Sequence, residues 1–317
     1  MSSTLKKFLE SFRQCHQDIV LAKRKNEAHL YIERNNILSL GKISGLEILA
    51  EPFSDGVKMK IVVKKGKKIN QPIFLCFGVL GKVGVQKIVP EIILEDDSEA
   101  QILAHCFFPQ AENIQHQMKA KIQVGKRSKL FYQEIHYHGE NFGAIVQPEI
   151  EVLSDQNSIF GSKFILSSGT VGQLNINLTV RLKREAVADI FSKIIGQGSK
   201  DEIRILDKII LEGERSRSLI KMRGVVVKGG KLFFQGETRA NSVARESQGH
   251  TDCQEIVIGQ KSLAQSIPII QVENPEARIT HEASVGKVNQ KELEVLMTRG
   301  LSEKEAIDFI IRGRLKE

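Results

Sequence analysis

The sequence predicts a mainly β protein with helices only at its two ends. From about residue 43 to residue 280 the chain consists of short strand-like runs separated by Gly, Asn, Asp and Ser. Helical periodicity is nearly absent between these runs, which excludes a doubly wound α/β fold. A sandwich, a barrel and a parallel β-helix remain. The modest proline content and the many β-branched aliphatic residues favour the last of these, a solenoid whose coils bury one continuous core.

The first element, within residues 1–42, is expected to be an amphipathic helix. Its apolar residues recur at intervals of three and four positions and are Leu5, Phe8, Leu9, Phe12, Ile19 and Val20. Lys and Gln occupy most of the other face. A helix with this pattern buries its apolar side against another surface, so the N-terminal helical segment is expected to pack on the β core.

The β core is expected to span residues 43–280. Residues 174–182 alternate strictly and place five aliphatic side chains on one face, and residues 118–124 repeat the pattern. One stretch departs from it, because residues 184–195 show helical spacing and are followed by Gly196. The strand-like surroundings of this stretch keep a strand open as the alternative.

The C-terminal region, residues 281–317, is expected to be a helical hairpin. Residues 291–299 form one predicted helix that ends at Gly300, and Ser302 with Glu305 gives a capping box for the next. The inner faces of the two helices are expected to be Leu293, Leu296 and Met297 in the first and Ala306, Phe309 and Ile310 in the second. Such a hairpin needs a surface to pack on.

The amino-acid composition argues against a membrane-spanning, a secreted and a nucleic-acid-binding protein. The 317 residues are 41% hydrophobic, and no apolar run approaches the ~20 residues of a membrane span. Lys6, Lys7 and Glu10 interrupt the apolar N-terminal stretch, so a signal peptide is not expected and the cytoplasm is the expected location. The net charge of +8 would suit nucleic acid, but only 6% of residues are aromatic. The densest basic cluster, residues 64–68, has the pattern of a solvated turn, so nucleic-acid binding is not expected.

The cysteines predict free thiols. None of the four belongs to a CxxC pair, so a disulfide framework is not expected in a cytosolic chain of this length. Three have the apolar or helical neighbours of a buried thiol: Cys15, Cys76 and Cys106. Cys253 differs because His250 and Asp252 precede it, a setting in which a thiolate forms more easily.

Cys253 precedes His281 by 28 positions, with strand-like sequence between them. Thiol, imidazole and carboxylate groups are metal ligands, and these can meet only if the fold sets distant strands side by side. The alternative is structural: His281 caps a coil, and Glu282 pairs with Arg278. His250 is equally compatible with a ligand, a group that orients a ligand, or an ordinary turn residue, and the same holds for Asp252.

The C-terminal third resembles a known family. Residues 269–284, which include Thr-His-Glu-Ala-Ser at 280–284, and residues 299–306 closely resemble the C-terminal signature of the SufB/SufD iron–sulfur cluster assembly scaffolds. Residues 236–268 are similar to the last β-helix coils of that family. The resemblance is specific from about Ser216 to the end. It implies a right-handed parallel β-helix core flanked by helical segments.

The resemblance also implies partners. In this family the C-terminal helical region docks a SufC-like ABC-type ATPase, and two scaffold chains pair through the ends of their β-helices, with the cluster built near that junction. Apo iron–sulfur proteins would then receive the cluster. The short chain is most similar to the minimal archaeal and anaerobic type, which implies a homodimer. Residues 280–284 are closer to SufB than to SufD, in which Gly commonly follows the His.

An iron–sulfur cluster bound by Cys253, His281 and Glu282 is the site that the resemblance implies. One departure stands out, because Ser262 occupies the position of a SufB cysteine, and a serine cannot replace a thiolate as a sulfur acceptor. The stretch His-x-Asp-Cys that ends at Cys253 is typical of the minimal scaffolds.

Two other functions remain to be weighed. A structural dimeric adaptor of the ATPase, without a cluster of its own, is compatible with the same sequence. A β-helix enzyme acting on polysaccharides would need sugar-stacking aromatics, which a chain with no Trp and three Tyr scarcely supplies. No segment matches GxxxxGK[ST], so ATP hydrolysis is expected in the partner and the chain itself is expected to be a scaffold rather than an enzyme.

Overall fold

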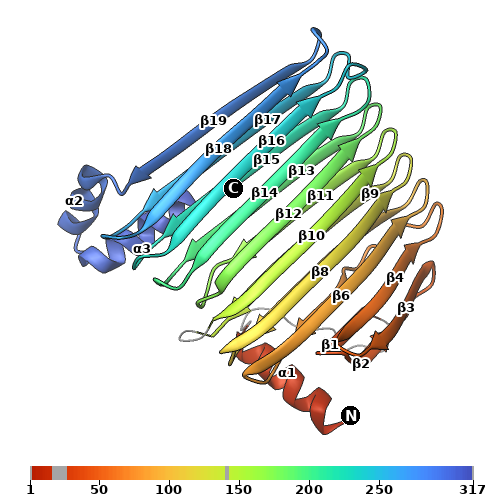
Figure 1. Ribbon diagram of the computed structural model, residues 1–317, viewed down its shortest axis with the longest axis horizontal. Helices are drawn as coiled ribbons and strands as arrows, with labels where there is room; N and C mark the ends of the chain where they lie inside the picture. The colour runs from red at the N-terminus through yellow and green to blue at the C-terminus, as the bar shows by residue number, and fades with distance from the viewer. Residues whose placement is uncertain (1, 16–26, 140–142, 316–317) are drawn as a thin grey trace.

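Successive strands alternate between two parallel sheets, so each coil of the chain adds one strand to each sheet. The computed structural model describes residues 2–15, 27–139 and 143–315. Figure 1 shows the strands stacked in one long row, with helical segments at both ends of the row. This arrangement confirms the predicted β-helix core with terminal helices.

The first sheet has ten strands: β1 (His29–Glu33), β2 (Asn36–Gly41), β5 (Ile73–Gly78), β7 (Glu99–Phe108), β9 (Lys129–His138), β11 (Ile159–Leu166), β13 (Val187–Gly196), β15 (Arg217–Val226), β17 (Gln248–Val257) and β19 (Arg278–Lys287). The second sheet has nine: β3 (Leu46–Phe53), β4 (Gly56–Val63), β6 (Val83–Leu94), β8 (Asn113–Val124), β10 (Ala144–Ser154), β12 (Gly172–Leu182), β14 (Glu202–Leu211), β16 (Lys231–Ala240) and β18 (Leu263–Val272). The first coil begins with two antiparallel pairs, β1 with β2 and β3 with β4.

Alternation along the strands builds the interior. In β12 every second side chain is buried, from Leu174 through Leu182, as the strict sequence alternation predicts. The inward residues of one strand stack on those of the next coil, as Leu174 does on Val146 and Ile203. The lumen between the two sheets is therefore a mostly aliphatic core that runs the length of the solenoid.

The helical spacing at residues 184–195 belongs to a strand, β13, so the strand alternative is correct there. Ala188, Ile190 and Ile194 point into the lumen. The outer face of β13 also carries apolar residues, because a C-terminal helix covers Ile195. Apolar residues on both faces remove the period of two and imitate a helical pattern.

The N-terminal helix, α1 (Ser3–Cys15), packs on the outer face of the first sheet. Phe8 and Phe12 are buried against Tyr31, Cys76 and Phe107, which confirms the expected amphipathic helix. Its predicted continuation through Ile19 and Val20 lies outside the described residues.

The C-terminal hairpin consists of α2 (Gln290–Thr298) and α3 (Glu303–Arg314). The predicted capping box is present, because the Ser302 hydroxyl accepts from the backbone of Glu305 while the Glu305 carboxylate accepts from the backbone of Ser302. Gly300 has φ +95° and ends the first helix as predicted. None of the helices in the described part of the chain is long and apolar enough to cross a lipid bilayer.

The predicted inner face of the hairpin is wrong at Met297 and Phe309. These side chains are 42% and 62% exposed, whereas Leu293, Ala306 and Ile310 form the core between the helices. Helix α3 is rotated relative to the prediction because Ile311 packs on the outer face of the first sheet. The apolar stripe of α3 therefore has two partners, the other helix and the sheet, and Phe309 faces neither.

Candidate functional site

Cys253 and His281 lie on neighbouring strands at the C-terminal end of the lumen. Strands β17 and β19 pair in parallel, with Thr251 opposite His281 and Cys253 opposite Ala283. Cys253 and His281 therefore face the same side of the sheet. A Cβ atom placed on Gly236, across the lumen in β16, would lie 3.9 Å from both the Cys253 Sγ and the His281 Cε1. The two side chains converge on the space that this glycine leaves empty.

Glu282 does not join them. It pairs with Asp252 in the register, so it points to the outer face of the sheet and is exposed. Asp252 forms an ion pair with Arg223, and the His250 Nδ1 lies 2.8 Å from the Thr280 hydroxyl. The two polar neighbours that made Cys253 distinctive in the sequence thus lie on the opposite face of the strand from its thiol.

Two carboxylates that the sequence analysis missed lie inside instead. Glu255 follows Cys253 by two positions and is therefore inward, and among the described residues neither of its carboxylate oxygens has a hydrogen bond of good geometry, although the Ser266 hydroxyl lies beside it. Asp207 reaches the lumen from the second sheet and contacts the Ser192 hydroxyl at 3.4 Å. The C-terminal lumen cluster is defined here as Asp207, Cys253, Glu255, Ser266 and His281. The spacing of two from Cys253 is the sequence signal that could have identified Glu255.

Burial sets the protonation of this cluster. It raises the pKa of Cys253 to about 12, and the charges of Glu255 and Asp207 add to the effect. The expectation of an easily formed thiolate is therefore wrong, because the polar neighbours lie outside and the thiol lies inside. Burial also raises the pKa of Glu255 and of Asp207 to about 7 and lowers that of His281. At pH 7 the cluster thus keeps the Cys253 proton and part of the protons of its two carboxyl groups, and it would release them on binding a cation.

Ser262, at the position of the SufB cysteine, belongs to the corner between β17 and β18. Its hydroxyl accepts the Gly229 N–H at 2.9 Å and donates to the Ile258 carbonyl at 3.0 Å. These hydrogen bonds hold the turn, in which Gly259 and Lys261 both have positive φ. The serine therefore has a structural role at a coil corner.

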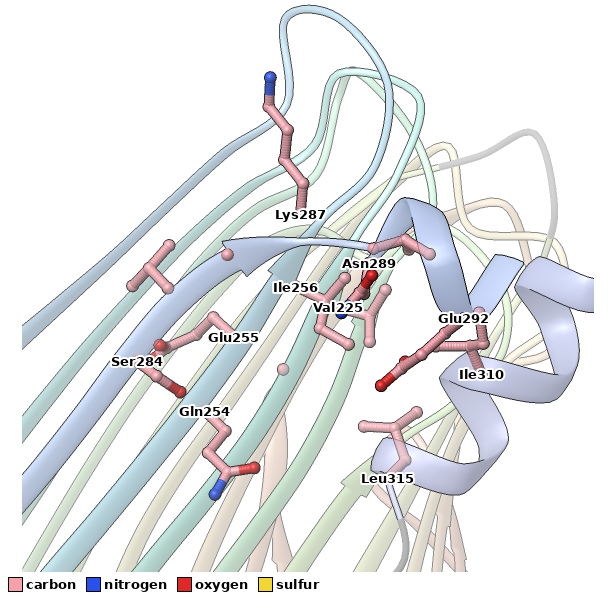
Figure 2. Close-up of a pocket in the computed structure, with 14 residues that line it drawn as sticks. Val225, Gln254, Glu255, Ile256, Ser284, Lys287, Asn289, Glu292, Ile310 and Leu315 are labelled. Atoms are coloured by element: carbon pink, nitrogen blue, oxygen red, sulfur yellow. The ribbon is translucent and has the colours of Figure 1, made fainter. Parts of the chain in front are cut away.

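A surface pocket adjoins the cluster from the side of the helical hairpin. Figure 2 shows it between the ends of β17 and β19 and helix α3, with Gln254 and Ser284 on the strands and Ile310 and Leu315 on the helix side. Glu255 is among the lining residues. The pocket therefore reaches the strand position of Glu255, whose carboxylate oxygens themselves are buried.

Comparisons with known proteins give one family. Residues 85–314 match the family model described as "SUF system FeS cluster assembly, SufBD core domain". The chain is 36% identical over 286 residues to an iron–sulfur cluster assembly SufBD family protein of Methanocaldococcus jannaschii, which covers 90% of this chain and 89% of the relative. It is 32% identical over 296 residues to one of Pyrococcus horikoshii, which covers 92% of this chain and 87% of the relative.

Proposed function

The chain belongs to the SufBD family of iron–sulfur cluster assembly proteins, and we propose that it is the scaffold on which a cluster is built. In this proposal two copies meet at the C-terminal ends of their solenoids, a partner ABC-type ATPase supplies the energy, and apo proteins in the cytoplasm receive the product. The observation that carries the proposal is the convergence of Cys253 and His281 in the last coils of the lumen.

The side chains of the C-terminal lumen cluster suit an iron–sulfur cluster that must later be released. Iron in clusters is held chiefly by thiolates, and a histidine ligand makes the site less thiolate-rich. One copy offers a thiol at Cys253 and an imidazole at His281, so two copies offer two of each. Because burial holds Cys253 as a thiol, iron binding must displace its proton, and Glu255 is placed beside it as a proton acceptor. Reprotonation would then favour release.

The last coil offers an edge for a second copy. Strands β18 and β19 end their sheets, so within the described part of the chain one side of each ten-residue strand has no neighbouring strand. Long edges with apolar side chains favour further strand pairing. The exposed apolar residues on these strands are Leu263, Ile267, Ile270, Val272 and Val285. A two-fold axis would bring the same edge of a second copy onto them, and Glu282 would then lie beside the junction.

The helical hairpin offers a separate surface for the ATPase. Val295, Met297 and Phe309 are exposed there, and a groove beside them is lined by Glu292, Val295, Leu296, Phe309, Ile310 and Gly313. We expect Phe309→Ala to weaken ATPase binding by about 30-fold, the effect of losing an anchor residue worth ~2 kcal/mol. The control is Phe131→Ala, which removes a partly exposed phenylalanine from the middle of the solenoid. Equal loss in both variants, measured by calorimetry with the purified ATPase, would place the docking site elsewhere.

Anaerobic reconstitution tests the scaffold itself. The wild-type chain, Cys253→Ser and the control Cys76→Ser are given iron and sulfide, and cluster content is followed by visible absorption and by iron and sulfide analysis. Cys76 is also a buried thiol, but it lies under α1. We expect a cluster in the wild type and in Cys76→Ser, and none in Cys253→Ser. A wild-type chain that dimerises and binds the ATPase yet never takes up a cluster would favour the adaptor function.

A further inference from the structure

A second group of ligand-type side chains lies in the lumen near the N-terminal end of the solenoid. Cys106 comes from β7, and Glu134 and His136 come from β9. The Cys106 Sγ, a Glu134 carboxylate oxygen and a His136 ring nitrogen all lie within 4.8 Å of one another. His116, from β8 in the opposite sheet, places its Nε2 3.8 Å from the same Sγ. All four residues are buried.

Three contacts approach the spacing of ligands around a four-coordinate metal. Bond lengths of 2.0–2.3 Å in a tetrahedral site place the ligand atoms about 3.3 to 3.8 Å apart. The Cys106 Sγ is 3.7 Å from the Glu134 Oε1 and 3.8 Å from the His116 Nε2. The His136 Nε2 is 2.6 Å from the Glu134 Oε1, a hydrogen bond that would open by less than an ångström on metal binding. His116 lies outside the group whose ligand atoms are all within 4.8 Å of one another, so its ring must move toward Glu134 and His136 to complete the coordination.

The tautomer of His116 is fixed in the form that a metal needs. The Gln86 Nε2 donates to the backbone carbonyls of Arg34 and Gly78, at 3.0 and 3.3 Å. Its Oε1 must therefore be the atom that lies 3.0 Å from the His116 Nδ1, which donates to it. The Nε2 is left with its lone pair, on the side of Cys106. Burial lowers the pKa of His116 to about 3, so the ring is neutral.

Glu134 is also oriented toward the same space, and the charges of the four side chains would balance that of a divalent cation. The Tyr132 hydroxyl donates to the Glu134 Oε2 at 2.9 Å, which leaves Oε1 toward Cys106 and His136. Outer hydrogen bonds of this kind orient metal ligands. A divalent ion with one thiolate, one carboxylate and two neutral imidazoles has no net charge, which suits a buried position.

We propose that Cys106, His116, Glu134 and His136 bind a single divalent transition-metal ion, Zn²⁺ or Fe²⁺, separate from the cluster site. A purely structural polar network fits less well. Its two sulfur contacts, at 3.7 and 3.8 Å, are long. The proposal does not depend on cluster assembly, because it uses none of the C-terminal residues.

Cobalt is the probe for this site. The full-length chain with Cys15→Ser, Cys76→Ser and Cys253→Ser keeps Cys106 as its one thiol. It is expressed in cobalt-supplemented minimal medium, because the buried ion must enter during folding. We expect about one Co²⁺ per chain, a thiolate-to-cobalt charge-transfer band and tetrahedral d–d bands. A folded chain without bound cobalt, or with cobalt but no charge-transfer band, would overturn the proposal.

Two variants distinguish ligation from packing. In the same background His116→Gln should remove the tetrahedral spectrum, because it deletes an imidazole ligand. Gln86→Leu deletes only the group that orients His116 and should lower the metal affinity about 10 to 100-fold. The control Gln117→Leu alters an outer-face glutamine of the same strand as His116 and should leave the affinity unchanged. Wild-type affinity in both His116→Gln and Gln86→Leu, with circular dichroism showing intact folds, would also contradict the site.

Discussion

The two polar clusters of the lumen contain the same kinds of side chain but differ in enclosure. The N-terminal cluster, around Cys106 and Glu134, has coils on both sides and an outer helix over its sheet. The C-terminal cluster, around Cys253 and Glu255, lies beside the last coil, where the sheets end. A thiol and a carboxylate at a closed position suit a retained ion, whereas the same groups beside an open edge suit a product that leaves.

Hydrogen bonding separates the two clusters further. Glu134 accepts hydrogen bonds from Tyr132 and His136, and these outweigh its burial, so its pKa is lowered. Glu255 is also buried, and there burial outweighs the lowering effects of the Ser266 hydroxyl and the Arg223 charge, so its pKa is raised to about 7. Two inward carboxylates in one lumen therefore have opposite charge preferences, and the cause is the strength of the donors and positive charges beside each.

The largest expected effect is a complete separation of two metal signals. Cys106→Ser should lose the mononuclear ion and keep the capacity to form a cluster, and Cys253→Ser should do the reverse, because the two thiols lie in different coils of the lumen. Metal analysis of the purified chains and anaerobic reconstitution measure the two signals. If either substitution removes both the bound ion and the capacity to form an iron–sulfur cluster, the two lumen clusters are parts of one site.

The next effect concerns stability in the metal-free chain. Glu134→Ala leaves Tyr132 and His136 buried without their shared acceptor, and we expect it to lower the free energy of unfolding by ~3 to 5 kcal/mol. Glu255→Gln instead removes an ionisation that burial opposes, so at pH 7 it should raise the free energy of unfolding, by up to ~3 kcal/mol. Urea unfolding at pH 7, followed by circular dichroism, measures both. Equal losses would mean that Glu255 has bonding partners in solution.

The contrast between clusters also shows what the sequence could predict. Alternation gave the strand of residues 174–182, and the spacing of Cys253 and His281, with the family resemblance, gave two residues that the fold sets on one face. Glu282 was included because it belongs to the Thr-His-Glu-Ala-Ser signature of the family, although neighbours in a strand point to opposite faces. Counting by two from Cys253 would have identified Glu255 as a carboxylate on the same face as the thiol.

The N-terminal cluster could not be found in this way. Cys106 lies in an apolar run, and nothing local shows that His116, ten positions on and in the other sheet, faces it. Only the register between coils brings them together, and residues about 30 positions apart stack, as Gln86 does on His116. Without a visible repeat, that register is not readable from one sequence. Local spacing failed at Phe309 for a related reason, since the partners of α3 are tertiary.

The pH dependence of stability should differ at the two ends. Glu255 has a folded pKa of about 7 against an ordinary value of 4.5, so its folded form binds a proton that the unfolded form has lost. Stability should therefore fall by about 1.4 kcal/mol per pH unit between about pH 4.5 and 7, and level off above. Glu134, whose pKa is lowered, contributes above its ordinary pKa and loses that contribution on acidification.

Urea unfolding of the metal-free wild type and of Glu255→Gln at half-unit steps from pH 5 to 8 measures this slope. Asp207, with a folded pKa of about 7 as well, should give the wild type a second contribution of the same sign. Glu255→Gln should therefore flatten the curve by about half. If the free energy of unfolding of Glu255→Gln depends on pH as steeply as that of the wild type, groups other than Glu255 cause the pH dependence.

The smallest expected effect tests the space at the open end. A Cβ on Gly236 would lie 2.8 Å from the Thr251 methyl carbon and 3.9 Å from the Cys253 Sγ, so Gly236→Ala must displace Thr251. Overpacking of this size costs ~1 to 3 kcal/mol, and the added methyl group occupies the space onto which Cys253 and His281 converge. We expect a modest loss of stability and a larger loss of cluster content on reconstitution.

The control is Gly286→Ala in the last strand, where a Cβ would meet nothing within 4 Å. If Gly236→Ala forms a cluster as readily as Gly286→Ala, the cluster does not occupy the lumen between Cys253 and His281, and the open end of the solenoid is not the place of assembly.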